Sequence, residues 1–139
     1  MLMSWRDRVT FVRQRAGGRC EYCLTDERLS GVKHEIDHIE PKSAGGNNNL
    51  DNLCLSCSNC NSLKWTRTHG IDPMSNNKAR LFNPRQQVWK THFQWSLNKL
   101  EIIGRTPCGR ATIATLDMNN DLIVGARQIW IMVNRHPPV

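Results

Sequence analysis

Apolar residues recur at helical spacing close to the start of the chain. Ser4 opens a capping box with Asp7, and Gly17-Gly18 would end the helix that follows at about Ala16. One face of this segment carries three apolar side chains, those of Trp5, Val9 and Val12. The sequence therefore predicts one amphipathic helix at the N-terminus.

The middle of the chain has shorter and more varied patterns. Residues 31–39 read as an extended strand, and residues 41–49 as a loop with Gly45-Gly46 and three asparagines. Residues 57–68 read as a short helix. Strand and helix in this order indicate an α+β fold.

The remainder of the chain changes character after His69-Gly70. Residues 72–83 are polar, with prolines nearby, and look like a linking loop. The expected elements after it are a helix over 84–92, a hairpin of strands 93–95 and 99–103, a helix starting at Thr106-Pro107, and a last helix capped by Asn119 or Asn120. The last helix has an apolar stripe of Leu122, Ala126, Ile129, Trp130 and Val133. We therefore expect an N-terminal helix over 1–18, a core over 19–69 and a C-terminal extension of hairpin and helices over 70–139.

Composition narrows the class of protein. The chain has 139 residues, with 19 Lys and Arg against 12 Asp and Glu, a net charge of +7. A basic surface favours polyanions, most commonly nucleic acid, with an anionic membrane second. No apolar run is long enough for a signal peptide or a membrane span, which predicts a cytoplasmic protein with reduced thiols. Six cysteines in that setting favour metal binding over disulfides.

The cysteines form two CxxC pairs. Each pair can donate two thiolates to one tetrahedral zinc ion, and the predicted ligands are Cys20, Cys23, Cys57 and Cys60. Cys54 complicates the choice, since Cys54-x-x-Cys57 is also a CxxC. We favour Cys57 and Cys60, which leaves Cys54 and Cys108 as ordinary buried thiols. The long segment between the pairs must then carry a function of its own.

A second group of motifs lies between and just after these pairs. It comprises Glu35-Ile36-Asp37-His38-Ile39-Glu40-Pro41, then Gly45-Gly46, Leu50-Asp51-Asn52-Leu53 and Cys60-Asn61-Ser62-Leu63-Lys64. Over about residues 19–68 this arrangement resembles the HNH endonuclease family. The resemblance implies a small ββα-metal core stapled by a four-cysteine zinc site, and cleavage of phosphodiester bonds in DNA, most often double-stranded, rather than RNA.

The residue types fit that chemistry. A carboxylate oxygen from Asp37 and a carbonyl oxygen from Asn61 suit a hard ion such as Mg²⁺ or Mn²⁺. His38 can act as general base near neutral pH. By resemblance, Asn52 holds the loop and orients this base. Neighbours on a regular strand face opposite ways, so Asp37 and His38 can serve one phosphate only if the strand ends or twists there, which Pro41 favours.

Basic residues near these motifs are candidates for nucleic-acid contacts. Lys64, Lys42 and Arg67 could hold phosphate oxygens, although they could also form a plain solvated rim. His34 is expected to be structural or to contact phosphate. The competing hypothesis is a non-catalytic zinc module that binds nucleic acid. A homodimer is a further possibility, because one active site cuts one strand.

Overall fold

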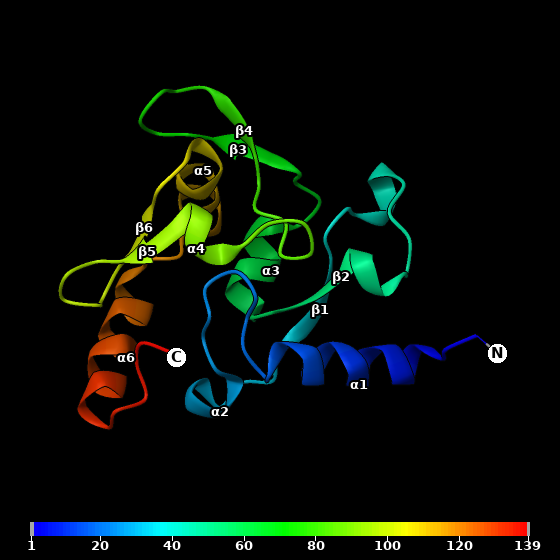
Figure 1. Ribbon diagram of the computed structural model, residues 1–139, viewed down its shortest axis with the longest axis horizontal. Helices are drawn as coiled ribbons and strands as arrows, with labels where there is room; N and C mark the ends of the chain where they lie inside the picture. The colour runs from blue at the N-terminus through cyan, green and yellow to red at the C-terminus, as the bar shows by residue number, and fades with distance from the viewer. Residues whose placement is uncertain (1, 139) are drawn as a thin grey trace. The chain divides into compact units, whose positions relative to one another are not determined.

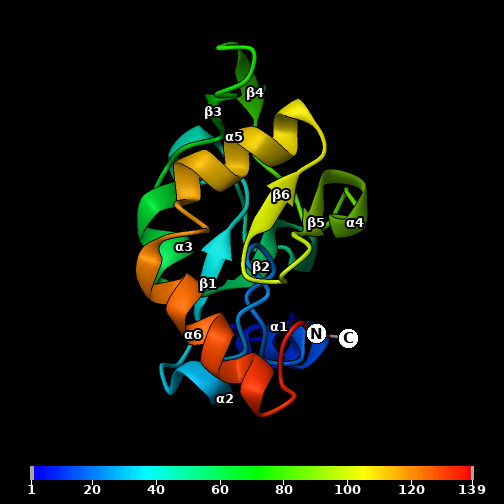
Figure 2. The same cartoon turned by 90° about the vertical axis from the view of Figure 1, so that its left-hand side faces the viewer.

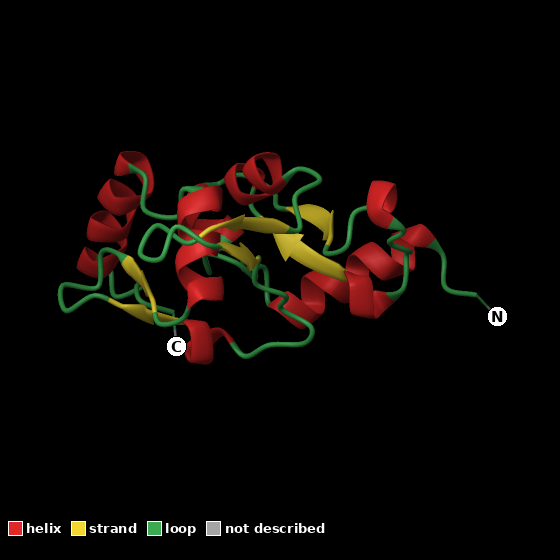
Figure 3. Cartoon of the chain, turned by 90° about the horizontal axis from the view of Figure 1, so that it is seen from above, coloured by secondary structure: helices red, strands yellow, loops and turns green. Residues whose placement is uncertain are grey.

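The structure, a computed structural model, describes residues 2–138, and these divide into two compact units. The first unit contains the residues up to Thr68 together with Asn83–Arg85. The second contains His69–Phe82 and the residues from Gln86 onward. Both units contain helices and a few short antiparallel strands, so the predicted α+β class is confirmed. Figure 3 shows the helices in red and the strands in yellow. Over the described residues, no helix combines the length and apolarity needed to cross a membrane.

The first unit is built around one antiparallel strand pair and a helix. Its elements in chain order are α1 (Trp5–Ala16), α2 (Glu27–Ser30), β1 (Glu35–His38), two 3-10 turns η1 (Lys42–Ala44) and η2 (Leu50–Asn52), β2 (Leu53–Ser56) and α3 (Ser58–Lys64). Figure 1 shows β1, β2 and α3 following one another in this unit. This is the ββα order that the family resemblance implied.

The helix α1 begins and ends where its capping residues predict. The hydroxyl of Ser4 accepts a hydrogen bond from the Asp7 amide at 3.1 Å, and Gly17 ends the helix in the left-handed conformation with φ 63°. Val12 is fully buried, whereas the side chain of Trp5 stays 47% exposed. Only part of the expected apolar face therefore enters the core, which leaves Trp5 available for another contact.

The core of this unit lies between α1 and the strands. Val12, Leu53 and Leu55 are fully buried, and Ile36 packs against them. β1 and β2 pair in a register that runs from Glu35 opposite Ser56 to His38 opposite Leu53. Since side chains alternate along a strand, Ile36 and His38 belong to one face of β1, and Glu35 and Asp37 to the other. α3 packs against β1.

Two sequence expectations in this unit need correction. The expected strand over 31–39 is ordered as a strand only over Glu35–His38. The strand β2 has no counterpart among the expected elements. Its four residues are all buried, so Leu53–Ser56 shows no alternation of polar and apolar side chains that could signal a strand.

The second unit contains two hairpins and three helices. They are β3 (His69–Ile71) with β4 (Lys78–Arg80), α4 (Trp89–His92), β5 (Phe93–Trp95) with β6 (Ile102–Gly104), α5 (Pro107–Leu116) and α6 (Asp121–Met132). α5 packs on β6 and on both strands of the first hairpin, which Figure 2 shows from the side. The predicted second hairpin is confirmed, with its return strand starting later than expected.

The expectation of a linking loop over 72–83 is wrong, because β3 and β4 pair across it. The turn between them depends on Asp72, whose carboxylate is fully buried and accepts from the Met74 amide, the Ser75 hydroxyl and the guanidinium of Arg110. Arg110 lies on α5, far away in sequence. A local polar pattern could not reveal a turn held by a distant arginine.

The helices of this unit follow their capping signals better than their apolar patterns. Thr106 caps α5 with its hydroxyl, and Asn120 rather than Asn119 caps α6. The helix expected over 84–92 forms only at Trp89–His92. Of the stripe expected on α6, Trp130 is buried, but Leu122 is 87% exposed and Ile129 63% exposed.

Candidate functional site

The four predicted zinc ligands lie together. The Sγ atoms of Cys20, Cys23, Cys57 and Cys60 all fall within 4.8 Å of one another, and those of Cys23 and Cys57 are 3.7 Å apart. Zn–S bonds of about 2.3 Å in a tetrahedron place sulfurs roughly 3.8 Å apart. The donor set and its spacing therefore fit one tetrahedral zinc ion.

Local backbone geometry prepares these thiols. The Cys23 amide points at Cys20 Sγ, and the Cys60 amide points at Cys57 Sγ, which is also the N-cap of α3. Hydrogen bonds from Cys20 and the other neighbouring thiols hold the pKa of Cys23 well below its ordinary value. Burial raises the pKa of Cys20 well above its own. Each CxxC turn thus directs a backbone amide at a sulfur of the cluster.

The structure resolves the ambiguity at Cys54. This thiol lies outside the cluster, 3.5 Å from the Tyr22 hydroxyl and 3.6 Å from Asp37 Oδ2. Burial, and next the negative charge of Asp37, raise the pKa of Cys54 well above its usual range. The structure groups Cys57 and Cys60 with the first CxxC pair, and Cys54 is a neutral buried thiol beside Asp37.

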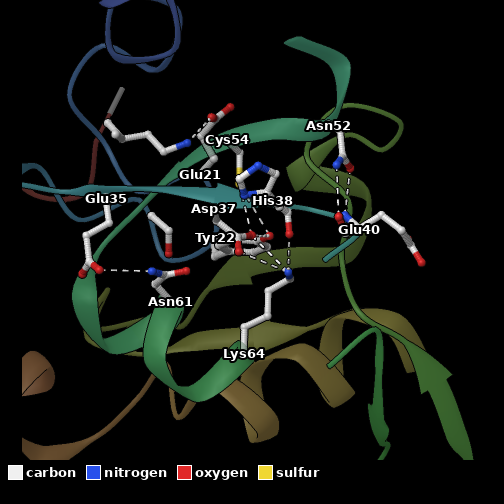
Figure 4. A network of polar contacts seen from close by, with 12 residues as sticks. Glu21, Tyr22, Glu35, Asp37, His38, Glu40, Asn52, Cys54, Asn61 and Lys64 are labelled. Atoms are coloured by element: carbon white, nitrogen blue, oxygen red, sulfur yellow. Dashed lines mark hydrogen bonds and ion pairs between the residues drawn. The ribbon is translucent and has the colours of Figure 1, made fainter. Parts of the chain in front are cut away.

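Asp37 is buried, and two donors besides the Cys54 thiol contact its carboxylate (Figure 4). The Tyr22 hydroxyl donates to Oδ2 at 2.6 Å, and the Lys64 ammonium donates to Oδ1 at 3.2 Å. Burial raises the pKa of Tyr22 well above 10, so its hydroxyl remains a proton donor. Tyr22, the second residue after Cys20, was not predicted as a site residue, because a tyrosine inside a CxxC turn ordinarily indicates a side chain that packs in the core.

Lys64 requires a correction. The sequence placed it at the surface in contact with phosphate, but it is only 1% exposed. Its ammonium pairs with Asp37 and also donates to the backbone oxygen of His38 at 3.0 Å. Lys64 lies on the side of α3 that packs against β1, so its charge is directed into the unit rather than to solvent.

His38 occupies the last position of β1 and contacts two residues, Asn48 and Trp5, that the sequence patterns did not link to it. Its Nε2 lies 2.8 Å from Asn48 Oδ1, in the loop before η2. Its ring stacks on the indole of Trp5, with centroids 6.0 Å apart and an interplanar angle of 4°. His38 is therefore held on the α1 side of the strand, opposite to the buried carboxylate of Asp37.

Asn52 ties together the loop that follows β1. Its amide oxygen accepts from the Glu40 amide at 2.8 Å, and its amide nitrogen donates to the backbone oxygens of Glu40 and Asn47 (Figure 4). Gly46 completes this closure, because a Cβ there would lie 1.8 Å from the Glu40 oxygen. These contacts are the ones expected of a residue that holds the loop.

A cleft of about 290 Å³ opens at the end of β1. It is lined by both Asp37 and His38, despite their opposite directions, because the strand ends there. Asn61 also lines it, and its amide nitrogen donates to Glu35 Oε1 at 3.1 Å. The full lining is Ile36, Asp37, His38, Pro41, Lys42, Ser43, Asn61, Trp65 and Thr66.

The other predicted contacts lie in different settings. Lys42 lines the cleft and is exposed, while Arg67 is exposed and donates to the Leu63 backbone oxygen. His34 is buried, with Nε2 2.8 Å from the Thr25 oxygen, which is a structural position. Trp65 was not anticipated. It is 71% exposed at the cleft, with an unusual backbone of φ 48° and ψ −118°.

Comparison with known families covers the same part of the chain. Residues 20–67 match the family model described as HNH endonuclease. The match begins at Cys20, the first residue of the cysteine cluster, and ends just after the cleft residue Thr66. No curated protein and no solved structure was found to match the chain.

Proposed function

Residues 20–67 of this chain form an HNH endonuclease domain, and on this premise we propose that the protein hydrolyses phosphodiester bonds of DNA with the help of a divalent ion. The observation that carries the proposal is the single cleft lined by Asp37, His38 and Asn61. These are a carboxylate, an imidazole and an amide, the groups required to hold an ion and to move a proton.

The oxygen donors of the cleft fit a hard cation. Asn61 gives its amide nitrogen to Glu35, which leaves its carbonyl oxygen for a ligand. Asp37 accepts from Tyr22 and Cys54 at Oδ2 and from Lys64 at Oδ1, and Oδ1 keeps a further lone pair for an ion. Mg²⁺ or Mn²⁺ held by Asp37 and Asn61 would neutralise charge on the scissile phosphate and its leaving oxygen.

His38 is the proposed general base. Because Asn48 offers an oxygen to Nε2, the neutral imidazole carries its proton on Nε2 and its lone pair on Nδ1. Nδ1 then accepts a proton from the attacking water, and the imidazolium keeps its hydrogen bond to Asn48. Asn52 supports the base indirectly, since its bonds to Glu40 and Asn47 hold the loop that carries Asn48.

The substrate we propose is double-stranded DNA. The net charge of +7 supports binding to a polyanion. The exposed Lys42 lines the cleft, and the exposed Arg67 follows the cleft residue Thr66 in the sequence. One active site cuts one strand, so a double-strand break requires a homodimer or two successive nicks.

Supercoiled plasmid provides the test. We expect zinc-loaded protein to nick it with Mg²⁺ or Mn²⁺ and to stop when EDTA is added. His38→Ala should lower the rate by about 10²- to 10⁴-fold. Asp37→Asn should be similarly impaired, whereas Asp51→Asn, which changes an exposed carboxylate of the same domain, should cut like the wild type.

The alternative, a zinc module that binds DNA without cutting it, makes the opposite prediction. Under this alternative, the wild type would bind the plasmid but would not nick it, whichever metal is added. Nicking that survives His38→Ala undiminished would equally exclude the proposed mechanism and point to a contaminating nuclease.

A further inference from the structure

The helix α1 lies outside the HNH domain match yet reaches the proposed base through two side chains. The indole of Trp5 stacks on the His38 ring. The guanidinium of Arg8 donates to the backbone oxygen of Asn48 at 2.6 Å, and Asn48 in turn contacts His38 Nε2. One helix therefore contacts the imidazole directly on its face and indirectly at its Nε2 edge.

The arrangement follows from the helix and strand geometry. Trp5 and Arg8 are three residues apart, and Val12 is four further on, so all three share one face of α1. Val12 is fully buried against β2 and anchors this face. Ile36 joins the same core, and His38, two residues on, projects from the same side of β1. The end of the apolar face is thus directed at the base.

The far end of the helix is also fixed. Arg15 donates to the backbone oxygens of Leu50, the first residue of η2, and Leu53, the first residue of β2, at 3.0 and 2.6 Å. Arg8 and Arg15 therefore bind the start and the end of the segment that carries Asn48 and Asn52. Movement of α1 would displace both the base and its partner loop.

We propose that Trp5 and Arg8 are positioning residues for His38, so that α1 is a working part of the active site. The inference rests on the proposed role of His38 as base. Stacked rings restrict rotation of the imidazole, and the face of an indole attracts the imidazolium that forms when the base takes a proton. Arg8 fixes Asn48 through its backbone oxygen. The side-chain oxygen of Asn48 then holds the proton on Nε2 of His38, which leaves Nδ1 of His38 as the acceptor.

The test compares matched variants on this one helix. Trp5→Leu is paired with Phe11→Leu, since both aromatic side chains are about equally exposed, at 47% and 42%. Arg8→Gln is paired with Arg6→Gln, which removes the same charge from an exposed side chain. Steady-state nicking then gives kcat and KM for each protein.

Trp5→Leu and Arg8→Gln are expected to lower kcat by about 5- to 10-fold while leaving KM within about 2-fold. Trp5→Tyr should restore most of kcat, because it returns an aromatic face. Phe11→Leu and Arg6→Gln should match the wild type. A rise in KM at constant kcat would overturn the proposal, because it would show that Trp5 binds DNA directly. Equal losses of kcat in the control variants would also overturn it, because they would show that α1 only supports the fold.

A second readout does not depend on cleavage. The ring protons of His38, identified by their loss in His38→Ala, should move in the NMR spectrum of zinc-loaded Trp5→Leu but not of Phe11→Leu, because the ring current of the indole is removed. If the wild type fails to cut DNA, the proposed function is refuted while this shift still supports the contact. Unmoved His38 signals in Trp5→Leu refute the positioning role whatever the activity.

Discussion

Replacing Lys64 with methionine tests the most unusual electrostatic feature of the site, a buried ion pair beneath the cleft. The side chains of Lys64 and Asp37 are 2% and 4% exposed, and their nearest charged atoms are 3.2 Å apart. Methionine keeps most of the apolar stem of lysine and removes the charge. The variant therefore leaves the carboxylate of Asp37 buried without its counter-charge.

The expected cost follows from the contacts that remain. Removing one partner of a buried ion pair costs about 3–5 kcal/mol of unfolding free energy. Asp37 keeps the hydrogen bond from Tyr22 at 2.6 Å, and methionine leaves little empty space. We therefore expect Lys64→Met to lose about 3 kcal/mol, near the lower end of that range.

Urea unfolding at a fixed excess of zinc provides the measurement, since bound zinc itself stabilises the folded state by mass action. Lys42→Met removes the same charge from an exposed lysine and should change the unfolding free energy by less than about 0.5 kcal/mol. The double variant Asp37→Leu with Lys64→Met should lose less than Lys64→Met alone, because it leaves no unpaired charge.

A loss below about 1 kcal/mol in Lys64→Met would refute this reasoning, since exposed ion pairs give values of that size. A double variant that is less stable than the single one would also refute it. It would show that the pair contributes net stability rather than only compensating for its own burial.

Four further predictions follow from individual residues. Cys60→Ser should lower bound zinc from one equivalent per chain, measured by elemental analysis, and a full equivalent would contradict the four-cysteine site. Asn52→Ala should cost about 2 kcal/mol in urea unfolding, because it removes the hydrogen bonds that the Asn52 amide makes to the backbone of Glu40 and Asn47; a neutral result would exclude the loop-holding role. Trp65→Gly should stabilise the protein by about 1 kcal/mol by relieving its positive φ, and a loss would show that the indole packs. Hydrogen bonds from the Arg110 guanidinium chiefly hold the pKa of Asp72 below 3.8, so the stabilisation by its carboxylate is complete above about pH 4 and is lost as the pH falls further. The difference in unfolding free energy between wild type and Asp72→Asn should therefore narrow below about pH 4. A difference that stays constant with pH would refute the stabilising role of the carboxylate.

Signals carried by neighbouring residues were read correctly from the sequence. The caps at Ser4 and Thr106 act within one helical turn, so a few letters define them. The CxxC pairs likewise place two thiols on one turn, and their chemistry specifies a tetrahedral ion whatever surrounds them. The order of strand, loop and helix around Asp37 and Asn61 also follows from short motifs.

Features that depend on distant residues were missed. β2 is buried on both faces, so its sequence lacks alternation, and the β3–β4 turn is held by Arg110, nearly forty residues away. Lys64 was predicted to be a surface cation because lysine side chains are charged and are usually exposed. Only packing of α3 on β1 showed that this charge is directed at Asp37.

The sequence by itself determined the four cysteines of the proposed zinc site and the three candidate residues Asp37, His38 and Asn61, because each is encoded by residue type and short spacing. The tertiary structure alone decided how those residues are supported. It placed Tyr22 and Lys64 on the carboxylate and Trp5 on the imidazole, since such contacts arise when segments far apart in the chain pack together, and no local pattern records which segments will meet.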